Sequence, residues 1–449
     1  MRVLLVNAID QSRGIESLFP PLGLGYLAAW LRERVEGVEV RVVDDGVEHE
    51  IDAFRPNVVG ISAVSQNYGT AQRHARLAKT RGLPVVVGGV HISMLPASLS
   101  SEMDVGVIGE GEETLVELLG ALAGGSFDRE RLSAIPGVVY RDGDGELALT
   151  PPREPFEPLD RLPLPARDLL AVPHGGTCHL FSSRGCPYRC VFCASSRLWP
   201  RARALSAEYV VREIGTLAKR YAPRQIVFYD DLFVLDRRRL RSIVELVEAE
   251  RIGERVEFAV SVRANLVDEE VADLLKRMNV TAVSMGLESG CETTLAFLKP
   301  HVTVEDNRRA VSLLDRMGFA VNASFVIGSP DESRAEIEET LRFIENAPLN
   351  LAETYILTAY PGTPVWDYAL ERGLVFDDMD WGRLALGVED ASSFVHLSRR
   401  LTREELFGLY RAAQRLAKWK RRSSLARQAW RNPRRVVPFL VRRIASMRS

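Results

Sequence analysis

The stretch RGCPYRCVFC, residues 184–193, places three of the chain's five cysteines within eight positions. Cys186, Cys190 and Cys193 are separated by three and then two residues, so their thiolates can cover one face of a four-iron cubane. Thiolates are soft ligands that suit iron–sulfur clusters, zinc or Cu(I). Three protein ligands on four irons leave one iron open to bind a substrate, and we expect a [4Fe–4S] cluster of this kind.

Two other interpretations of the cysteine cluster stay open at this point. A structural zinc site would show paired CxxC knuckles or a histidine at a set spacing, and His174 and His179 do not stand at such a spacing. The three cysteines could also be unrelated buried residues. Of the two remaining cysteines, Cys178 is the nearest candidate for a fourth ligand, whereas Cys291 lies far downstream.

Downstream of Cys178 the chain alternates short strand-like runs with helical patterns. Six runs of this type predict a partial barrel of β/α units, with its chemistry at the carboxyl ends of the strands. The expected strands are residues 179–183, 225–229, 257–262, 282–286, 320–327 and 352–357.

Upstream, residues 1–125 show the same alternation, but with near-continuous apolar strands that are typical of a sheet covered on both faces. This pattern predicts a doubly wound, Rossmann-like parallel sheet that binds a ligand at the carboxyl ends of its strands. Residues 126–175 are rich in proline and are expected to form an inter-domain linker with a hairpin at 138–149. We therefore expect an α/β chain of four regions, namely residues 1–125, the linker 126–175, the partial (β/α)6 barrel 176–398 and a basic helical extension 399–449.

The composition fits an ordinary globular protein, because 46% of the 449 residues are hydrophobic and 26% are charged. This excludes a disordered chain, a collagen-like fibre and a disulfide-stapled miniprotein. No apolar stretch reaches the roughly 18 residues of a membrane span. The amino-terminal apolar run is too short for a signal peptide. We expect a protein of the reducing cytoplasm.

The net charge of −2 conceals a strongly basic end of the chain. Glu405 is the last acidic residue, and residues 406–449 contain 13 of the 58 Lys and Arg. Tryptophans and aliphatic residues among these cations would suit a helix at an anionic lipid surface. A helix packed on the acidic body is the second interpretation. Nucleic-acid binding is not expected, because no nucleic-acid module accompanies the basic segment.

CPYRCVFC resembles the CxxxCxxC signature of the radical SAM (S-adenosylmethionine) superfamily, with an aromatic residue before the last cysteine. Seven further segments occur in the same order as in the cobalamin-binding radical SAM subgroup. That subgroup includes methyltransferases acting on carbon and phosphorus and the oxidative cyclase of bacteriochlorophyll synthesis. The resemblance implies a Rossmann-like cobalamin domain followed by a partial barrel. The segments are PPLGLGYLAAWLRE, VVVGGVH, VIGEGEETL, FYDDLF, SMGLESG, FVIGSPDES and AYPGTP.

By the same resemblance, Cys186, Cys190 and Cys193 are the implied cluster ligands, and their open iron chelates S-adenosylmethionine. The other interpretations of the implied S-adenosylmethionine residues are a helix cap for the paired aspartates, a salt bridge for the arginine and a plain tight turn for the glycine. The implied residues are Phe192, Asp230, Asp231, Arg263, Glu288 and Gly328.

The implied cobalamin site lies at the ends of the first domain's strands. The sequence DQSRG at residues 10–14 lacks the histidine of the Asp-x-His-x-x-Gly motif, so the implied cobalt has no histidine below it. Glu110 and Glu112 could instead be capping acids at the start of a helix. The alternative for the whole domain is a Rossmann-like scaffold that does not bind cobalamin. The implied contacts are Ser62, Gly88, Gly89, His91, Gly109, Glu110 and Gly111.

The resemblance implies an enzyme that cleaves S-adenosylmethionine to a 5′-deoxyadenosyl radical and transfers methyl from methylcobalamin to an unactivated carbon of a small-molecule or lipid substrate. The implied cofactors are a [4Fe–4S] cluster, S-adenosylmethionine and cobalamin, with flavodoxin or ferredoxin as electron donor. One alternative is a cyclase or rearrangement enzyme without net methyl transfer. A second is a non-catalytic iron–sulfur sensor or electron carrier, which would be expected to have a fourth cysteine ligand.

Overall fold

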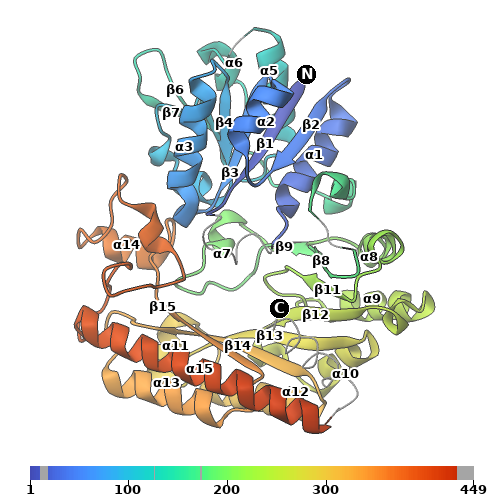
Figure 1. The fold of residues 1–449 in the computed structure, drawn as a ribbon, viewed down its shortest axis with the longest axis vertical. Coiled ribbons are helices and arrows are strands. Elements are labelled where there is room, and N and C mark those ends of the chain that lie inside the picture. Colours follow the sequence, from blue (N-terminus) through green and yellow to red (C-terminus); the bar gives the residue numbers. More distant parts are fainter. Residues whose placement is uncertain (11–18, 126, 172–173, 432–449) are drawn as a thin grey trace, which may run out of the picture. The chain divides into compact units, whose positions relative to one another are not determined.

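The computed structural model describes residues 1–10, 19–125, 127–171 and 174–431, the last seven of these by their backbone alone (Figure 1). Two compact units are present. The first consists of Met1–Asp231 and Thr358–Ala385, and the second of Leu232–Leu357 and Leu386–Ser449. Each unit is described by itself.

A seven-stranded sheet dominates the first unit, with the strand order β2-β1-β3-β4-β5-β6-β7. The first five strands are parallel, and the last two are antiparallel (Figure 1). The chain runs from β1 to β2 on one side and then to β3 on the other, which creates a switch point where such sheets bind ligands. The expected doubly wound sheet is confirmed. The strands are β1 (Arg2–Ala8), β2 (Glu39–Val43), β3 (Val58–Ala63), β4 (Val85–Gly88), β5 (Val105–Val107), β6 (Val138–Arg141) and β7 (Leu147–Leu149).

Apolar residues on successive positions of β1 explain why the sheet is covered on both faces. Val3, Leu4, Leu5 and Val6 are each at most 1% exposed, so both sides of the strand are buried. One core forms where the sheet meets α1 and α5. The helices of this region are α1 (Leu22–Arg34), α2 (Val47–Phe54), α3 (Tyr68–Lys79), α4 (Val90–Met94), α5 (Glu112–Ala123) and α6 (Arg129–Ser133).

Strands β6 and β7 come from the segment that we assigned to the linker. The expected hairpin forms there, and it also extends the first sheet, because β6 pairs with β5 in antiparallel register. Val138 and Val139 are fully buried at this edge. The hairpin itself was expected, but its pairing with β5 was not, because the proline-rich surroundings indicated a linker rather than a part of the sheet.

The first unit also contains the cluster segment and a later return of the chain. Strands β8 and β11 pair in parallel, and the short β9 and β10 pair in antiparallel fashion. Residues 358–385 return to this unit, where Trp381 packs edge-on against His91 with ring centroids 4.4 Å apart. The elements are β8 (Thr177–Leu180), β9 (Ser183–Arg184), α7 (Ser195–Leu198), β10 (Arg203–Ala204), α8 (Ala207–Tyr221), β11 (Gln225–Phe228), α14 (Pro364–Leu370) and the 3-10 helix η9 (Trp381–Leu384).

Four parallel strands form the sheet of the second unit. With β8 and β11 of the first unit, the chain contains all six strands that we expected downstream of Cys178. Every strand is followed by a helix, as a β/α arrangement requires. The elements are α9 (Arg237–Ala249), β12 (Glu257–Val262), α10 (Glu269–Arg277), β13 (Val280–Glu288), α11 (Glu292–Leu298), α12 (Val304–Arg316), β14 (Ala320–Ile327), α13 (Arg334–Asn346), β15 (Leu351–Ile356) and α15 (Arg403–Arg431).

Helix α15 carries the first part of the basic segment and packs against β15 and α13. Lys420 is buried and donates a 2.8 Å hydrogen bond to the carbonyl of Ala347, which is the C-cap of α13. A cation at a helix C-terminus is electrostatically favourable. The contact of Lys420 therefore supports the interpretation in which the basic segment forms a helix packed on the body of the protein. Residues 432–449 of the basic segment lie outside the described residues. None of the helices in the described ranges has the length and apolar character to cross a bilayer.

Trp381→Ala is expected to destabilise the first unit by about 3–5 kcal/mol, because it removes a large buried ring from its contacts with His91 and Tyr68. Urea denaturation followed by circular dichroism measures the change. Trp419→Ala is the matched control, because Trp419 is 52% exposed on α15 and its loss should change the free energy of unfolding by no more than about 0.5 kcal/mol. Equal effects of the two substitutions would contradict the packing of the returning segment.

Candidate functional site

The cysteine cluster lies in the loop that follows β9. Cys186, Cys190 and Cys193 are all half-buried, and the amide of Cys193 donates to the carbonyl of Cys190 over 3.2 Å. Burial raises the pKa of the Cys193 thiol to about 11, and Asp231 and the two other cysteines add to this effect. The three thiols are therefore close enough to influence one another. A metal centre is what would stabilise them as thiolates.

No group of three His, Cys, Asp or Glu within the described ranges is arranged to hold a metal ion. A cubane takes one thiolate per iron, so its three ligands spread over three metal atoms and need not converge on one point. The residue types and the shared loop fit a [4Fe–4S] cluster. Cys178 lies on β8, is 1% exposed, and has its pKa raised by burial.

Asp230 and Asp231 follow β11, and their side chains have different surroundings. Asp230 is 3% exposed and accepts a 2.6 Å hydrogen bond from the amide of Ser182 and another from its hydroxyl. This carboxylate therefore ties the end of β11 to the start of the cluster segment. Asp231 accepts from the hydroxyl of Ser195, and burial raises its pKa. Only Asp231 of the two lines the cavity described next.

A cavity of about 310 Å³ opens at the carboxyl ends of β3, β4 and β5. One wall consists of glycine-rich turns, and the opposite wall comes from the cluster segment and the end of β11. The floor is apolar. Volume and lining fit a site that holds a mostly apolar ligand or part of a larger one. The first wall includes Ser62, Gly88, Gly89, Gly109, Glu110, Gly111 and Glu112, and the second includes Phe181, Ser183, Arg184, Leu198, Trp199, Tyr229 and Asp231.

Gly89 shows why the first wall is built from glycine. Its φ of +99° lies in the region that favours glycine, and an added Cβ would lie 2.6 Å from the carbonyl oxygen of Ala63. Gly88 and Gly109, by contrast, have no atom within 4 Å of a built Cβ. Their open backbone suits the close approach of a flat ring. Six of the seven predicted cobalamin contacts therefore lie on one cavity wall.

His91 is the seventh predicted cobalamin contact, and it lies in the core rather than on the cavity wall. Its Nδ1 is 3.1 Å from the Ser65 hydroxyl, and its Nε2 is 3.0 Å from that of Ser98. The ring is fully buried beside Tyr68, with ring centroids 3.9 Å apart. Burial lowers the pKa of His91 to about 3, so the imidazole is neutral. The sequence could not reveal this, because the two serines reach His91 only through the fold.

The remaining predicted S-adenosylmethionine residues are divided between the units. Phe192 is half-buried in the turn between Cys190 and Cys193, in the first unit. Arg263, Glu288 and Gly328 follow or end β12, β13 and β14 in the second unit. All three therefore stand at carboxyl ends of strands, where the barrel pattern placed them.

Each of these three residues already has a partner in the fold. Arg263 donates to the carbonyl of Pro300 over 2.7 Å. Glu288 forms a buried ion pair with Lys299 over 3.2 Å. The amide of Gly328 donates to Glu332 over 2.6 Å, which makes Glu332 part of the turn after β14.

Glu332 is a residue that our sequence analysis did not single out. It is 3% exposed and accepts hydrogen bonds from the amides of Gly328 and Ser329. Burial raises its pKa to about 7, although these two hydrogen bonds act in the opposite direction. The FVIGSPDES segment contains this acid, but nothing in the sequence alone indicated that its carboxyl would be buried.

Several cavity residues also escaped the sequence analysis. Phe181, Trp199 and Tyr229 give the second wall its aromatic character, and the rings of Phe181 and Tyr229 are 5.7 Å apart. Arg184 directly precedes Gly185 and Cys186 and was visible in the motif, but its partners were not. These residues come from three separate segments that only the fold brings together.

Comparison with known proteins identifies the class of enzyme. The profile of the radical SAM superfamily matches residues 180–344, and that of the B12 binding domain matches residues 13–119. An uncharacterized methyltransferase of Pyrococcus horikoshii is 34% identical over 403 residues, which span 85% of each chain. The chain therefore belongs to the cobalamin-binding radical SAM family, and it is an enzyme. This confirms the resemblance to the cobalamin-binding radical SAM subgroup. It also confirms the cofactors of that family, which are a [4Fe–4S] cluster, S-adenosylmethionine and cobalamin.

Two further relatives and one solved structure extend this comparison. The anaerobic magnesium-protoporphyrin IX monomethyl ester cyclase of Rubrivivax gelatinosus is 26% identical and matches 84% of this chain and 71% of its own. The hopanoid C-3 methylase of Methylococcus capsulatus is 29% identical and matches 77% of this chain and 68% of its own. The fold also resembles the radical S-adenosylmethionine methyltransferase TsrM of Kitasatospora setae, solved with cobalamin and a [4Fe–4S] cluster. That match has a TM-score of 0.68 at 24% identity, over 83% of this chain and 78% of TsrM.

Replacing Cys186, Cys190 or Cys193 singly by alanine should reduce bound iron from about four per chain to near zero, because a cubane held by three thiolates does not survive the loss of one. Iron and sulfide determination after anaerobic reconstitution measures the effect. Cys178→Ala is the matched control and should keep its iron. Loss of iron in the Cys178 variant as well would indicate a fourth ligand and contradict an open iron.

The raised pKa of Glu332 predicts a pH-dependent stability. Between about pH 4.5 and 7 the folded protein retains a proton that the unfolded chain has lost, so stability falls as pH rises through this window. The total loss amounts to roughly 3 kcal/mol. Glu332→Gln should remove this decline, whereas Glu338→Gln, at an exposed position of α13, should preserve it. Urea midpoints measured between pH 5 and 8 test this, and an unchanged decline in the Glu332 variant would disprove the assignment.

Proposed function

We propose that this enzyme uses S-adenosylmethionine and cobalamin to transfer a methyl group to an unactivated carbon of a small-molecule or lipid substrate. The observation that carries the proposal is the cavity, whose two walls come from the glycine turns after β3, β4 and β5 and from the flank of the cysteine loop. Chemistry at the cluster and a ligand on the glycine wall would then share one enclosed volume.

The residues of this chain have distinct roles in the proposal. Cys186, Cys190 and Cys193 hold the cluster, which, with S-adenosylmethionine and cobalamin bound, supplies a carbon-centred radical and a transferable methyl group. Asp230 holds the start of the cysteine loop through Ser182. The open glycine backbone accepts the corrin. Protein groups thus orient cofactors that perform the difficult chemistry.

The lining of the cavity favours an apolar substrate that is kept away from water. Phe181, Trp199 and Tyr229 form an aromatic side, and aliphatic residues of the first sheet and of helices α1 and α5 form most of the remaining apolar lining. Exclusion of water protects reactive intermediates from side reactions. The hopanoid methylase among the relatives makes a lipid the first substrate class to test.

A second candidate function is cyclisation or rearrangement without net methyl transfer. The similarity to a magnesium-protoporphyrin monomethyl ester cyclase favours it, because that relative covers 84% of this chain. A third possibility, a sensor or carrier with four protein ligands, is disfavoured by the position of Cys178, which is buried within β8.

We propose that the electron comes from a flavodoxin or ferredoxin in the cytoplasm. A peripheral membrane contact through the basic segment is part of the same proposal. Trp419 supports the membrane contact, because its ring is 52% exposed on α15 and lies next to Lys418 in the sequence.

The decisive experiment combines the anaerobically reconstituted enzyme with S-adenosylmethionine, a low-potential reductant and candidate substrates. S-adenosylhomocysteine and 5′-deoxyadenosine should appear in equal amounts, with a product 14 mass units heavier than the substrate, as measured by liquid chromatography and mass spectrometry. Cys193→Ala is the control and should form neither coproduct. 5′-Deoxyadenosine without S-adenosylhomocysteine would point to the cyclase, and neither coproduct from the wild type would refute both enzymatic proposals.

A further inference from the structure

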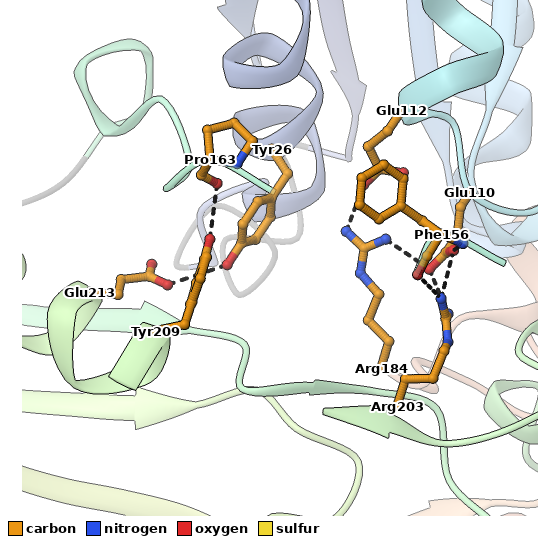
Figure 2. A network of polar contacts seen from close by, with 9 residues as sticks. All are labelled: Tyr26, Glu110, Glu112, Phe156, Pro163, Arg184, Arg203, Tyr209 and Glu213. Carbon is orange, nitrogen blue, oxygen red and sulfur yellow. Dashed lines mark hydrogen bonds and ion pairs between the residues drawn. The ribbon is translucent and has the colours of Figure 1, made fainter. Parts of the chain in front are cut away.

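Arg184 belongs to the second wall of the cavity, and its side chain contacts two residues of the first wall. It ends β9, two residues before Cys186, and its side chain reaches the acids at the start of α5 (Figure 2). The chain distance between Arg184 and these acids is more than 70 residues. This single side chain therefore connects the cysteine loop with the glycine wall.

The contacts of Arg184 divide between two carboxylates. Nη1 lies 2.8 Å from Oε1 of Glu110, and Nη2 lies 2.6 Å from Oε1 of Glu112. The three side chains are 15%, 11% and 5% exposed, respectively. Because water is largely excluded, the attraction is stronger than in a surface ion pair. Glu110 and Glu112 flank Gly111, so Arg184 contacts the residues on both sides of this glycine.

A second arginine strengthens the same contact from β10. Arg203 binds Glu110 over 2.7 Å and also donates to the carbonyl of Phe156 over 2.6 Å, as Figure 2 shows. Its side chain is 4% exposed. Glu110 is thus held by two guanidinium groups, which together keep its pKa below the usual range despite its burial. This engagement leaves the backbone of Gly109 and Gly111, rather than the Glu110 carboxylate, to meet a ligand.

The connection from Arg184 to Cys186 is short and conformationally restricted. Gly185, the residue between them, has a φ of +84°, and an added Cβ would lie 2.9 Å from Cβ of Trp199. A displacement of the arginine would therefore move the first cysteine with it. On the other side, a displacement of the two acids would move the turn at which α5 begins.

We propose that Arg184 is a positioning residue that sets the glycine wall at its working distance from the cysteine loop, and so governs both corrinoid binding and the coupling of the two uses of S-adenosylmethionine. The inference rests on the proposed function. It assigns to Arg184 a role in geometry, and none in the chemical steps themselves.

Arg184→Gln tests the proposal through ligand binding to the protein before any turnover. Hydroxocobalamin is titrated into the reconstituted enzyme and its dissociation constant measured by equilibrium dialysis and absorbance. We expect at least a tenfold weaker affinity with an unchanged iron content of about four per chain, because the three cysteines remain. Arg153→Gln is the matched control, since Arg153 pairs over 2.5 Å with Glu117 further along the same helix α5. It should change the affinity less than twofold.

A second readout distinguishes positioning from general destabilisation. At saturating hydroxocobalamin, the ratio of 5′-deoxyadenosine to S-adenosylhomocysteine should rise at least threefold in Arg184→Gln, because misplaced walls uncouple cleavage from transfer. Arg184→Lys keeps the charge but reaches one carboxylate, so its affinity and ratio should lie between those of the wild type and the glutamine variant. The lysine variant also serves if the glutamine variant fails to fold. Arg184→Gln leaves the Glu112 carboxylate without its arginine, whereas Glu110 keeps Arg203. The double variant Arg184→Gln/Glu112→Gln removes this unpaired charge, so part of the lost affinity should return.

Three outcomes would overturn these statements separately. Unchanged affinity and ratio in both Arg184 variants would refute the role of Arg184. Parallel loss of iron and hydroxocobalamin would also refute it, because the residue would then simply maintain the fold. A wild-type protein that takes up iron but no hydroxocobalamin would refute the proposed function itself.

Discussion

Parallel strands must all end at the same edge of their sheet, and the site depends on this constraint. The turns after β3, β4 and β5 come from residues far apart in the chain, yet the strand order brings them side by side. A single glycine turn would be a weak binding feature. Three adjacent turns, closed from the opposite side by the flank of the cysteine loop, enclose a cavity of about 310 Å³. The chemistry of the cavity thus follows from the topology and from which residues stand at one edge.

Much of this arrangement was predictable from the sequence, for identifiable physical reasons. Continuous apolar runs such as that of β1 indicated a sheet buried on both faces, and the cysteine spacing indicated a cluster loop. Glycine positions at the ends of β4 and before α5 marked the turns, because the chain must bend sharply there. Local features of this type are written in consecutive residues, and six of the seven predicted cobalamin contacts do line the cavity.

The pairing of charged and polar side chains was not predictable, because it is decided by residues distant in sequence. Asp230 and Asp231 are adjacent and chemically identical, yet one holds Ser182 and the other lines the cavity. Glu110 lines the cavity as expected of a cobalamin contact, and its carboxylate also pairs with two arginines that the sequence did not indicate. His91 followed a glycine pair in the manner of a pocket residue, and two serines together with Tyr68 hold it in the core. In each case the sequence indicated the residue, but the tertiary structure determines which side chains it contacts.

The return of residues 358–385 to the first unit has a consequence for biosynthesis. Trp381, which covers His91 in the core, is made only after the 126 residues of Leu232–Leu357 have been added. At a synthesis rate of about 5–20 residues per second, the 150 residues from Leu232 to Trp381 take roughly 8–30 s, and during this time His91 lacks the ring that covers it. The core around His91 can therefore be completed only after the strands of the second unit have been synthesised.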